Sequence, residues 1–168
     1  MHKYCFLFLL AASCGLALFA QQNSGQEPDV LQDTPVPAKI ALVIGNGNYA
    51  NLASLSNPVN DANDIAAVLR HLGFTVDILL NGNLEQMEDA VLLLKEKLRA
   101  EENGYGFFYY AGHGVQSGGD NFLIPVNANI PSENYLRNRA MSVQQVLDEL
   151  NEARNSLNVV VDFIKFIL

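Results

Sequence analysis

The sequence predicts an α/β domain, a parallel-sheet sandwich with helices on both faces. Apolar runs of strand length alternate with segments whose apolar residues recur at helical spacing, an order typical of strand–helix–strand units. The chain has 168 residues, 49% of them hydrophobic, which suffices for one globular domain with a packed core. Right-handed crossovers would join about four core strands, and ligands would meet the carboxyl ends of those strands.

The first strand is KIALVI, residues 39–44, and Gly45 marks its end. After a long loop, apolar residues at helical spacing predict a helix over 60–73. Asn60 or Asp61 is expected to cap this helix, and the glycine at its far end should stop it.

A second strand and helix follow directly. FTVDILL, residues 74–80, reads as a strand, and helix formers occupy 84–102 after the turn NGN. One apolar stripe marks the face that this helix should bury, and its members are Met87, Val91, Leu94 and Leu98.

The third strand, YGFFYYA at 105–111, runs into a glycine-rich polar loop. NFLIPV, residues 121–126, is then a short strand or hairpin arm, and Ser142 caps a helix over 143–154. The fourth core strand is LNVVV, residues 157–161.

The chain divides into a leader, a linker and the domain. Residues 1–20 have a short basic start, an apolar run and a small residue at the end, which predicts a signal peptide and a secreted or periplasmic domain. An uncleaved membrane anchor and a lipoprotein site at Cys14 remain alternatives. Residues 21–38 are polar with prolines and read as a linker, and 39–168 form the domain.

Cleavage after Ala20 would leave no thiol, because Cys5 and Cys14 both precede it. Disulfides and thiol catalysis would then be excluded from the mature chain. Loss of Lys3 changes the formal charge from −8 to −9, nine Lys plus Arg against eighteen Asp plus Glu. Such an acidic surface argues against a nucleic-acid partner and favours basic ones.

The loop after the first strand, GNGNYA from Gly45, matches the loose dinucleotide fingerprint, with Asp77 downstream in the second strand. The fingerprint requires its glycines to open directly into a helix that holds the pyrophosphate. Here turn formers and Pro58 delay the helix by roughly ten residues. We therefore favour glycines that serve a tight turn and keep nucleotide binding as the alternative.

His113 stands at the end of a buried strand between Gly112 and Gly114. Glycines permit a sharp turn and bring backbone amides close to a substrate carbonyl. The residues alone leave two interpretations open, a catalytic or ligand-binding histidine and a simple turn at a strand end.

Several motifs, in order, resemble the large-subunit region of caspase-like cysteine peptidases, especially bacterial metacaspase-like proteins. They are KIALVIGNGNY, L.NPVNDA, L...GF.V, YYAGHGVQ, G.NFLIPVNA and S...VL..L, and they run from about Lys39 to Val161. The resemblance implies the caspase-like fold and a hydrolase that cleaves proteins or peptides at an internal bond.

The resemblance also implies roles for individual residues. His113 would be the general base or acid partner of a cysteine, and Gly114 would supply a backbone amide to the oxyanion hole. Asp61 would line a pocket for an arginine or lysine side chain, although it can serve as a helix cap as well. Metacaspases commonly have a serine where this chain has Ala111, so one wall of that pocket lacks the family's hydroxyl.

The expected nucleophile is missing. The family pattern places an aspartate, one further residue and the cysteine at the end of the fourth strand, about 50 residues after the histidine. Asp162 matches the aspartate and would join the substrate pocket, but Ile164 occupies the position of the cysteine. Without a thiolate the histidine cannot form an acyl-enzyme, so the sequence predicts an inactive, truncated peptidase domain.

Two alternatives remain, a pseudoenzyme that binds basic peptides without cutting them and a nonfunctional fragment of a longer peptidase gene. We expect no cofactor and no metal site. The fourth strand would be an exposed edge with apolar residues, which predicts self-association.

Overall fold

The computed structural model describes residues 36–101, 103–153 and 156–165, the last stretch through its backbone alone. The predicted leader and almost all of the predicted linker lie outside these residues. Within the described ranges, no helix is both long enough and apolar enough to cross a bilayer.

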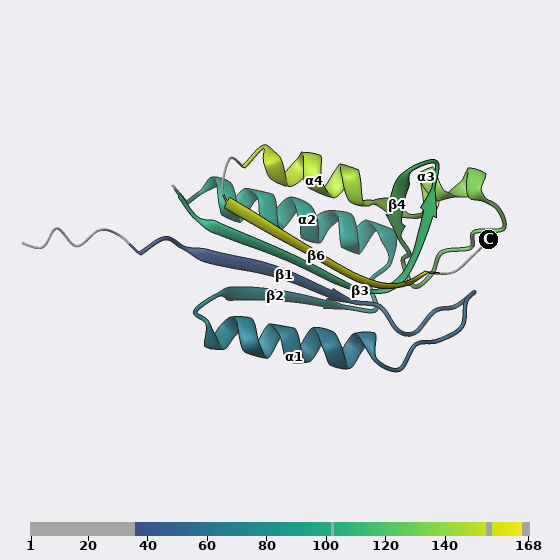
Figure 1. The fold of residues 1–168 in the computed structure, drawn as a ribbon, viewed down its shortest axis with the longest axis horizontal. Helices are drawn as coiled ribbons and strands as arrows, with labels where there is room; N and C mark the ends of the chain where they lie inside the picture. Colours follow the sequence, from purple (N-terminus) through teal and green to yellow (C-terminus); the bar gives the residue numbers. More distant parts are fainter. Residues whose placement is uncertain (1–35, 102, 154–155, 166–168) are drawn as a thin grey trace, which may run out of the picture. The chain divides into compact units, whose positions relative to one another are not determined.

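Four parallel strands form the core of the sheet in the order β2–β1–β3–β6 (Figure 1). They are β1 (Lys39–Gly45), β2 (Thr75–Leu80), β3 (Tyr105–Ser117) and β6 (Ser156–Lys165). The predicted α/β class and the four core strands are therefore confirmed.

The third strand runs six residues beyond its predicted end at Ala111 and becomes one arm of a hairpin. Its last residues pair antiparallel with β4 (Asp120–Leu123), and β4 pairs with the short β5 (Met141–Ser142). Gly118 and Gly119 form the turn with φ of 61° and 90°, a region that glycine adopts without steric cost. The glycine-rich loop of the sequence is thus a hairpin turn, and NFLIPV begins as its second arm.

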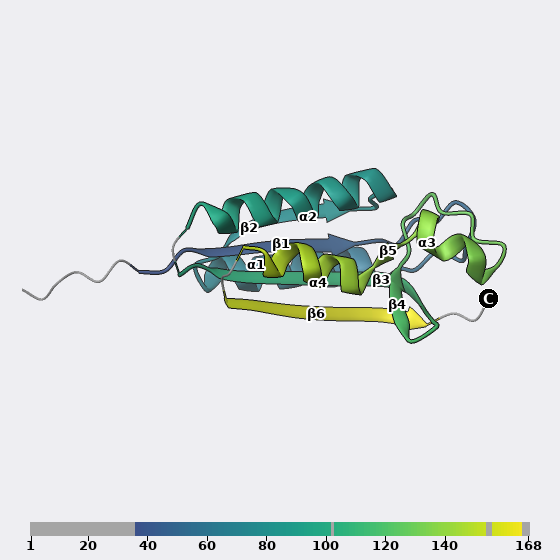
Figure 2. The same cartoon turned by 90° about the horizontal axis from the view of Figure 1, so that it is seen from above.

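Helices cover both faces of the sheet, as predicted. α1 (Pro58–His71) lies on one face, and α2 (Leu84–Arg99) and α4 (Val143–Asn151) run side by side over the other (Figures 1 and 2). The short η1 (Glu133–Tyr135) and α3 (Leu136–Arg139) precede β5.

Alternation along the strands divides the core between the two faces. Leu42 and Ile44 pack with α2 and α4, and all four residues of the predicted stripe on α2 are buried there. Ala41 and Val43 pack on α1. A third cluster, which includes Tyr49, Val115, Phe122 and Ile124, lies beyond the carboxyl ends of the strands.

The predicted cap of α1 is wrong. The helix begins at Pro58, after Asn57, and no side-chain cap bond forms there. Proline suits the first helical position, because its fixed φ matches the helix and its missing N–H would have no partner anyway. The predicted stop is confirmed, since Gly73 follows the helix with φ of 85°.

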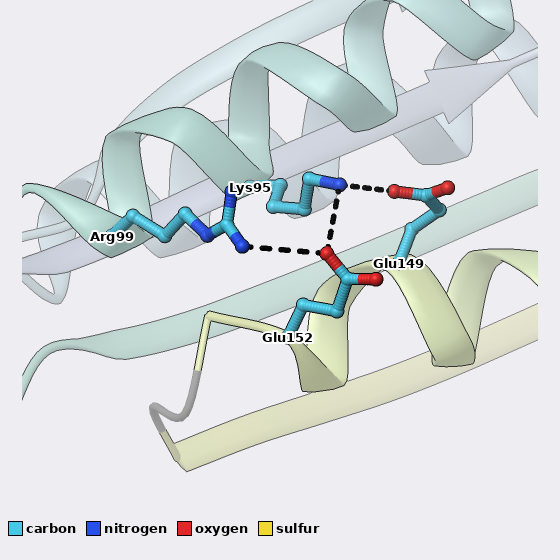
Figure 3. Close-up of polar contacts among 4 residues, drawn as sticks. All are labelled: Lys95, Arg99, Glu149 and Glu152. Carbon is cyan, nitrogen blue, oxygen red and sulfur yellow. Dashed lines mark hydrogen bonds and ion pairs between the residues drawn. The ribbon is translucent and has the colours of Figure 1, made fainter.

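Charged side chains join α2 to α4 (Figure 3). Lys95 on α2 binds Glu149 and, at 3.3 Å, Glu152. Arg99, one turn further along α2, also reaches Glu152 at 3.3 Å. The hydrogen bond with Glu149 raises the pKa of Lys95, so the ammonium stays charged across the neutral range.

Candidate active site

His113 lies near the carboxyl end of the parallel part of β3 and is buried, with 6% of its surface exposed. Its Nε2 is 2.8 Å from the Ala53 carbonyl oxygen. A carbonyl only accepts hydrogen bonds, so Nε2 carries the proton in this arrangement. Nδ1 is then the ring nitrogen left to accept a proton when His113 acts as a general base.

The loop between β1 and α1 holds Ala53 in this position. Asn46 N–H donates to the Ala111 carbonyl at 2.8 Å, and Ala50 N–H donates to the Val126 carbonyl at 2.8 Å. The loop therefore folds over the carboxyl edge of the sheet. Sequence reasoning missed Ala53, because a backbone acceptor leaves no mark in the residue type.

The register of the parallel strands aligns the positions that the sequence singled out. Gly45 is opposite Ala111 across β1 and β3, and Ala111 is opposite Asp162 across β3 and β6. His113 is opposite Ile164 in the same ladder. The fold thus brings the backbone at 162 and 164 beside that of the histidine strand.

The two glycines beside the histidine differ in what they do. A Cβ on Gly112 would lie 2.6 Å from two tyrosine hydroxyls, so this glycine is required by packing. His113 turns its N–H and its carbonyl toward Tyr49 and Ile124, on the β1 side of the strand. Because backbone groups alternate along a strand, those of Gly114 turn to the opposite edge, where β6 runs.

Asp61 lies in the first turn of α1 and is half-buried. A Cβ on Gly45 would be 2.6 Å from the Ala62 Cβ and from the Pro58 carbonyl oxygen. The first turn of α1 therefore packs against the end of β1, at the same edge of the sheet as His113. Asp61 therefore lies at the same edge of the sheet as His113. Its proposed role in substrate binding does not require a direct contact with the histidine.

The loop GNGNYA does not form a phosphate cradle. The N–H groups of Gly47 and Asn48 each donate to Asn81 Oδ1 at 3.0 Å, so these two amides are already used. The following helix begins only at Pro58. These contacts favour the tight-turn interpretation over nucleotide binding.

Within the part of the chain that the structure covers, no three His, Cys, Asp or Glu side chains gather as metal ligands.

Comparison with known proteins identifies related sequences. The family model described as Caspase domain matches residues 38–163, a range that contains Asp61, His113, Gly114 and Asp162. The Mucosa-associated lymphoid tissue lymphoma translocation protein 1 of Homo sapiens is 36% identical over 143 residues, which cover 82% of this chain. Its homolog in Mus musculus matches with the same identity and coverage. The matched part of this chain spans 16% of the length of each relative.

Proposed function

Since this chain belongs to the caspase domain family, we propose that its caspase-like peptidase domain keeps the histidine of a cysteine-peptidase site. With isoleucine at position 164, we propose that it does not cut peptides. The main support is the pairing of His113 with Ile164 across adjacent parallel strands. A cysteine at position 164 would lie directly beside His113 on the neighbouring strand, and we propose that its thiol would exchange a proton with the imidazole. Isoleucine has no ionisable group, so it cannot attack a carbonyl.

The chemistry of a site with a cysteine at position 164 follows from the same geometry. A thiolate at position 164 would attack the peptide carbonyl, and a carbon–sulfur bond would form while the carbon–nitrogen bond breaks. His113 would take the thiol proton and deliver it to the leaving amine. The oxyanion role is proposed for the Gly114 amide from its place directly after His113 in the G-H-G motif.

We further propose a preference for arginine or lysine in the substrate, as in metacaspase-like proteins. Asp61 is half-buried at the carboxyl edge, and Asp162 is level with Ala111 in the sheet. Two carboxylates near one edge favour a cationic side chain. Ala111 is 2% exposed and packs on α1, so it offers this pocket no hydroxyl.

Peptide binding to the parent chain tests the proposal. An arginyl peptide aldehyde should bind saturably in calorimetry, and Asp61→Asn should weaken binding about tenfold, the usual loss for a charge-assisted hydrogen bond. Asp64→Asn is the matched control, because this exposed carboxylate lies one turn along the same helix. Equal affinity for a glutamyl peptide would contradict the basic preference, and no binding at all would favour the alternative of a nonfunctional fragment.

Restoring the thiol tests the role of the site directly. An arginyl chloromethyl ketone should alkylate the Ile164→Cys variant and leave the parent chain unlabelled at this position. His113→Gln in the same background should suppress the reaction. Labelling that is indifferent to His113 would refute the proposed partnership.

We also propose that the domain is secreted or periplasmic, on the strength of the predicted leader. Self-association is proposed from β6, which among the strands described pairs with β3 alone. Its other edge would present unpaired backbone groups to a second chain.

A further inference from the structure

Two buried tyrosine hydroxyls lie against the backbone of His113. Tyr49 Oη accepts the His113 N–H at 2.7 Å, and Tyr110 Oη donates to the His113 carbonyl at 2.9 Å. The two hydroxyl oxygens are 3.4 Å apart. Tyr49 comes from the loop after β1 and Tyr110 from β3, so two segments that are far apart in the sequence bind the backbone of His113.

These contacts can close into a ring. The His113 N–H donates to Tyr49, the Tyr49 hydroxyl faces that of Tyr110, and Tyr110 returns to the His113 carbonyl. Tyr110 Oη is also 3.0 Å from the Ile124 carbonyl, which gives its proton a second acceptor. Burial raises the pKa of both tyrosines, so both hydroxyls keep their protons at neutral pH.

The hydroxyls are not needed to fill space, because phenylalanine would bury the same ring. A buried hydroxyl costs desolvation free energy and is retained only where it finds hydrogen-bond partners. Here both hydroxyls form hydrogen bonds with the main chain of His113. Gly112 leaves room for them, since a methyl group there would lie 2.6 Å from each oxygen.

Tyr49 also contacts the imidazole itself. The two ring centroids are 4.6 Å apart and the rings are tilted by 58°. The ring of Tyr49 therefore bears on one side of the imidazole, while the Ala53 carbonyl binds its Nε2.

We propose that Tyr49 and Tyr110 are positioning residues that fix the His113 backbone and so hold its imidazole against the Ala53 carbonyl. The inference deepens the proposed function, because it explains how the histidine is oriented for proton transfer. It also gives Gly112 a defined task, the admission of the two hydroxyls.

Hydrogen exchange of His113 tests the proposal in the full chain labelled uniformly with ¹⁵N. In the parent, the backbone N–H and the ring Nε2–H of His113 should both exchange slowly, and His113→Gln assigns them. Tyr49→Phe should accelerate both about five- to tenfold, as expected for one lost hydrogen bond. Tyr110→Phe should have a smaller effect, because the Ile124 N–H also donates to the His113 carbonyl, at 3.1 Å.

Two control variants separate positioning from general destabilisation. Val115→Ala removes buried apolar contacts in the cluster of Tyr49 but leaves both hydroxyls. Tyr105→Phe removes a hydroxyl from the exposed start of the same strand. Neither should accelerate His113 relative to Leu42, a core amide on β1, whereas Gly112→Ala should reproduce the effect of Tyr49→Phe.

Unchanged His113 exchange in Tyr49→Phe would overturn the proposal, and so would equal acceleration in Val115→Ala. The experiment uses neither peptide nor thiol. Its result is therefore independent of the peptide-binding test, and a failure of one can be told from a failure of the other.

Discussion

Replacement of Asn46 should destabilise the fold more than any other polar substitution in the loop after β1. This side chain is fully buried. Its Oδ1 accepts the Gly82 N–H at 2.9 Å, and its Nδ2 donates to the carbonyls of Ile124 at 3.2 Å and Gly82 at 3.4 Å. One amide group thereby ties the end of β1 to the turn before α2 and to the chain after β4.

The expected loss in Asn46→Ala follows from what remains unpaired. The Gly82 N–H is buried and would lose its acceptor, at a cost of about 1–3 kcal/mol. The Ile124 carbonyl would keep the Tyr110 hydroxyl and the Gly82 carbonyl would keep the Val126 N–H, so the lost donors add only about 1 kcal/mol. The free energy of unfolding should fall by about 2–4 kcal/mol.

Asn46→Asp gives a pH signature that only a buried site would show. The carboxyl oxygen that replaces Nδ2 would face the carbonyls of Ile124 and Gly82. Only a protonated carboxyl could donate to them, so the pKa of the new group would rise in the folded state. A raised pKa means that the stability is present below the unfolded value of about 3.9 and is lost as pH rises through the folded value. The variant should approach the parent near pH 4 and fall below it toward neutral pH.

Equilibrium urea unfolding, followed by circular dichroism, measures these differences. Asn48→Ala is the matched control, because Asn48 is exposed in the same loop, and its effect should stay within about 0.5 kcal/mol. An Asn46→Ala loss no larger than that of the control would refute the reasoning. A pH-independent Asn46→Asp variant would contradict the assigned burial.

Three further predictions concern the leader, self-association and the helix pair. The exported protein should begin at Gln21 by N-terminal sequencing and should sediment as a concentration-dependent oligomer, whereas a leader retained on a monodisperse monomer would contradict both proposals. Lys95→Gln should be less stable than the parent at neutral pH. Because the pKa of Lys95 is raised in the folded state, the stability that Lys95 contributes is fully present below its unfolded pKa of about 10.4. This contribution, and with it the difference between the two proteins, should be lost as pH rises through the higher folded-state pKa. Arg99→Gln should show no such titration, since the guanidinium stays charged.

Periodicity and strand punctuation sufficed to predict the sheet and most helices. The apolar stripe on α2 could be predicted because its four members repeat at helical spacing, and all four are buried in the structure. The start of α1 could not, because Pro58 begins the helix without any capping side chain. The sequence predicts no element for the segment containing α3, since one turn of helix carries no periodic signal.

The site was predictable only in part. His113 could be picked out because the glycines and the strand end mark it. Tyr49 and Ala53 could not, because they reach His113 through a loop whose path depends on backbone hydrogen bonds and on Asn46. Such contacts are tertiary and leave no spacing rule in the sequence.

The contacts that hold His113 come from the loop after β1, from Tyr110 on its own strand and from Ile124. These groups do not depend on which side chain occupies position 164. A well-ordered histidine is therefore expected with or without a thiol beside it, and its order is no evidence of catalysis. For the same reason the imidazole is already oriented when Ile164→Cys introduces a thiol, so labelling of this variant tests the nucleophile, and His113→Gln in the same background tests the partnership.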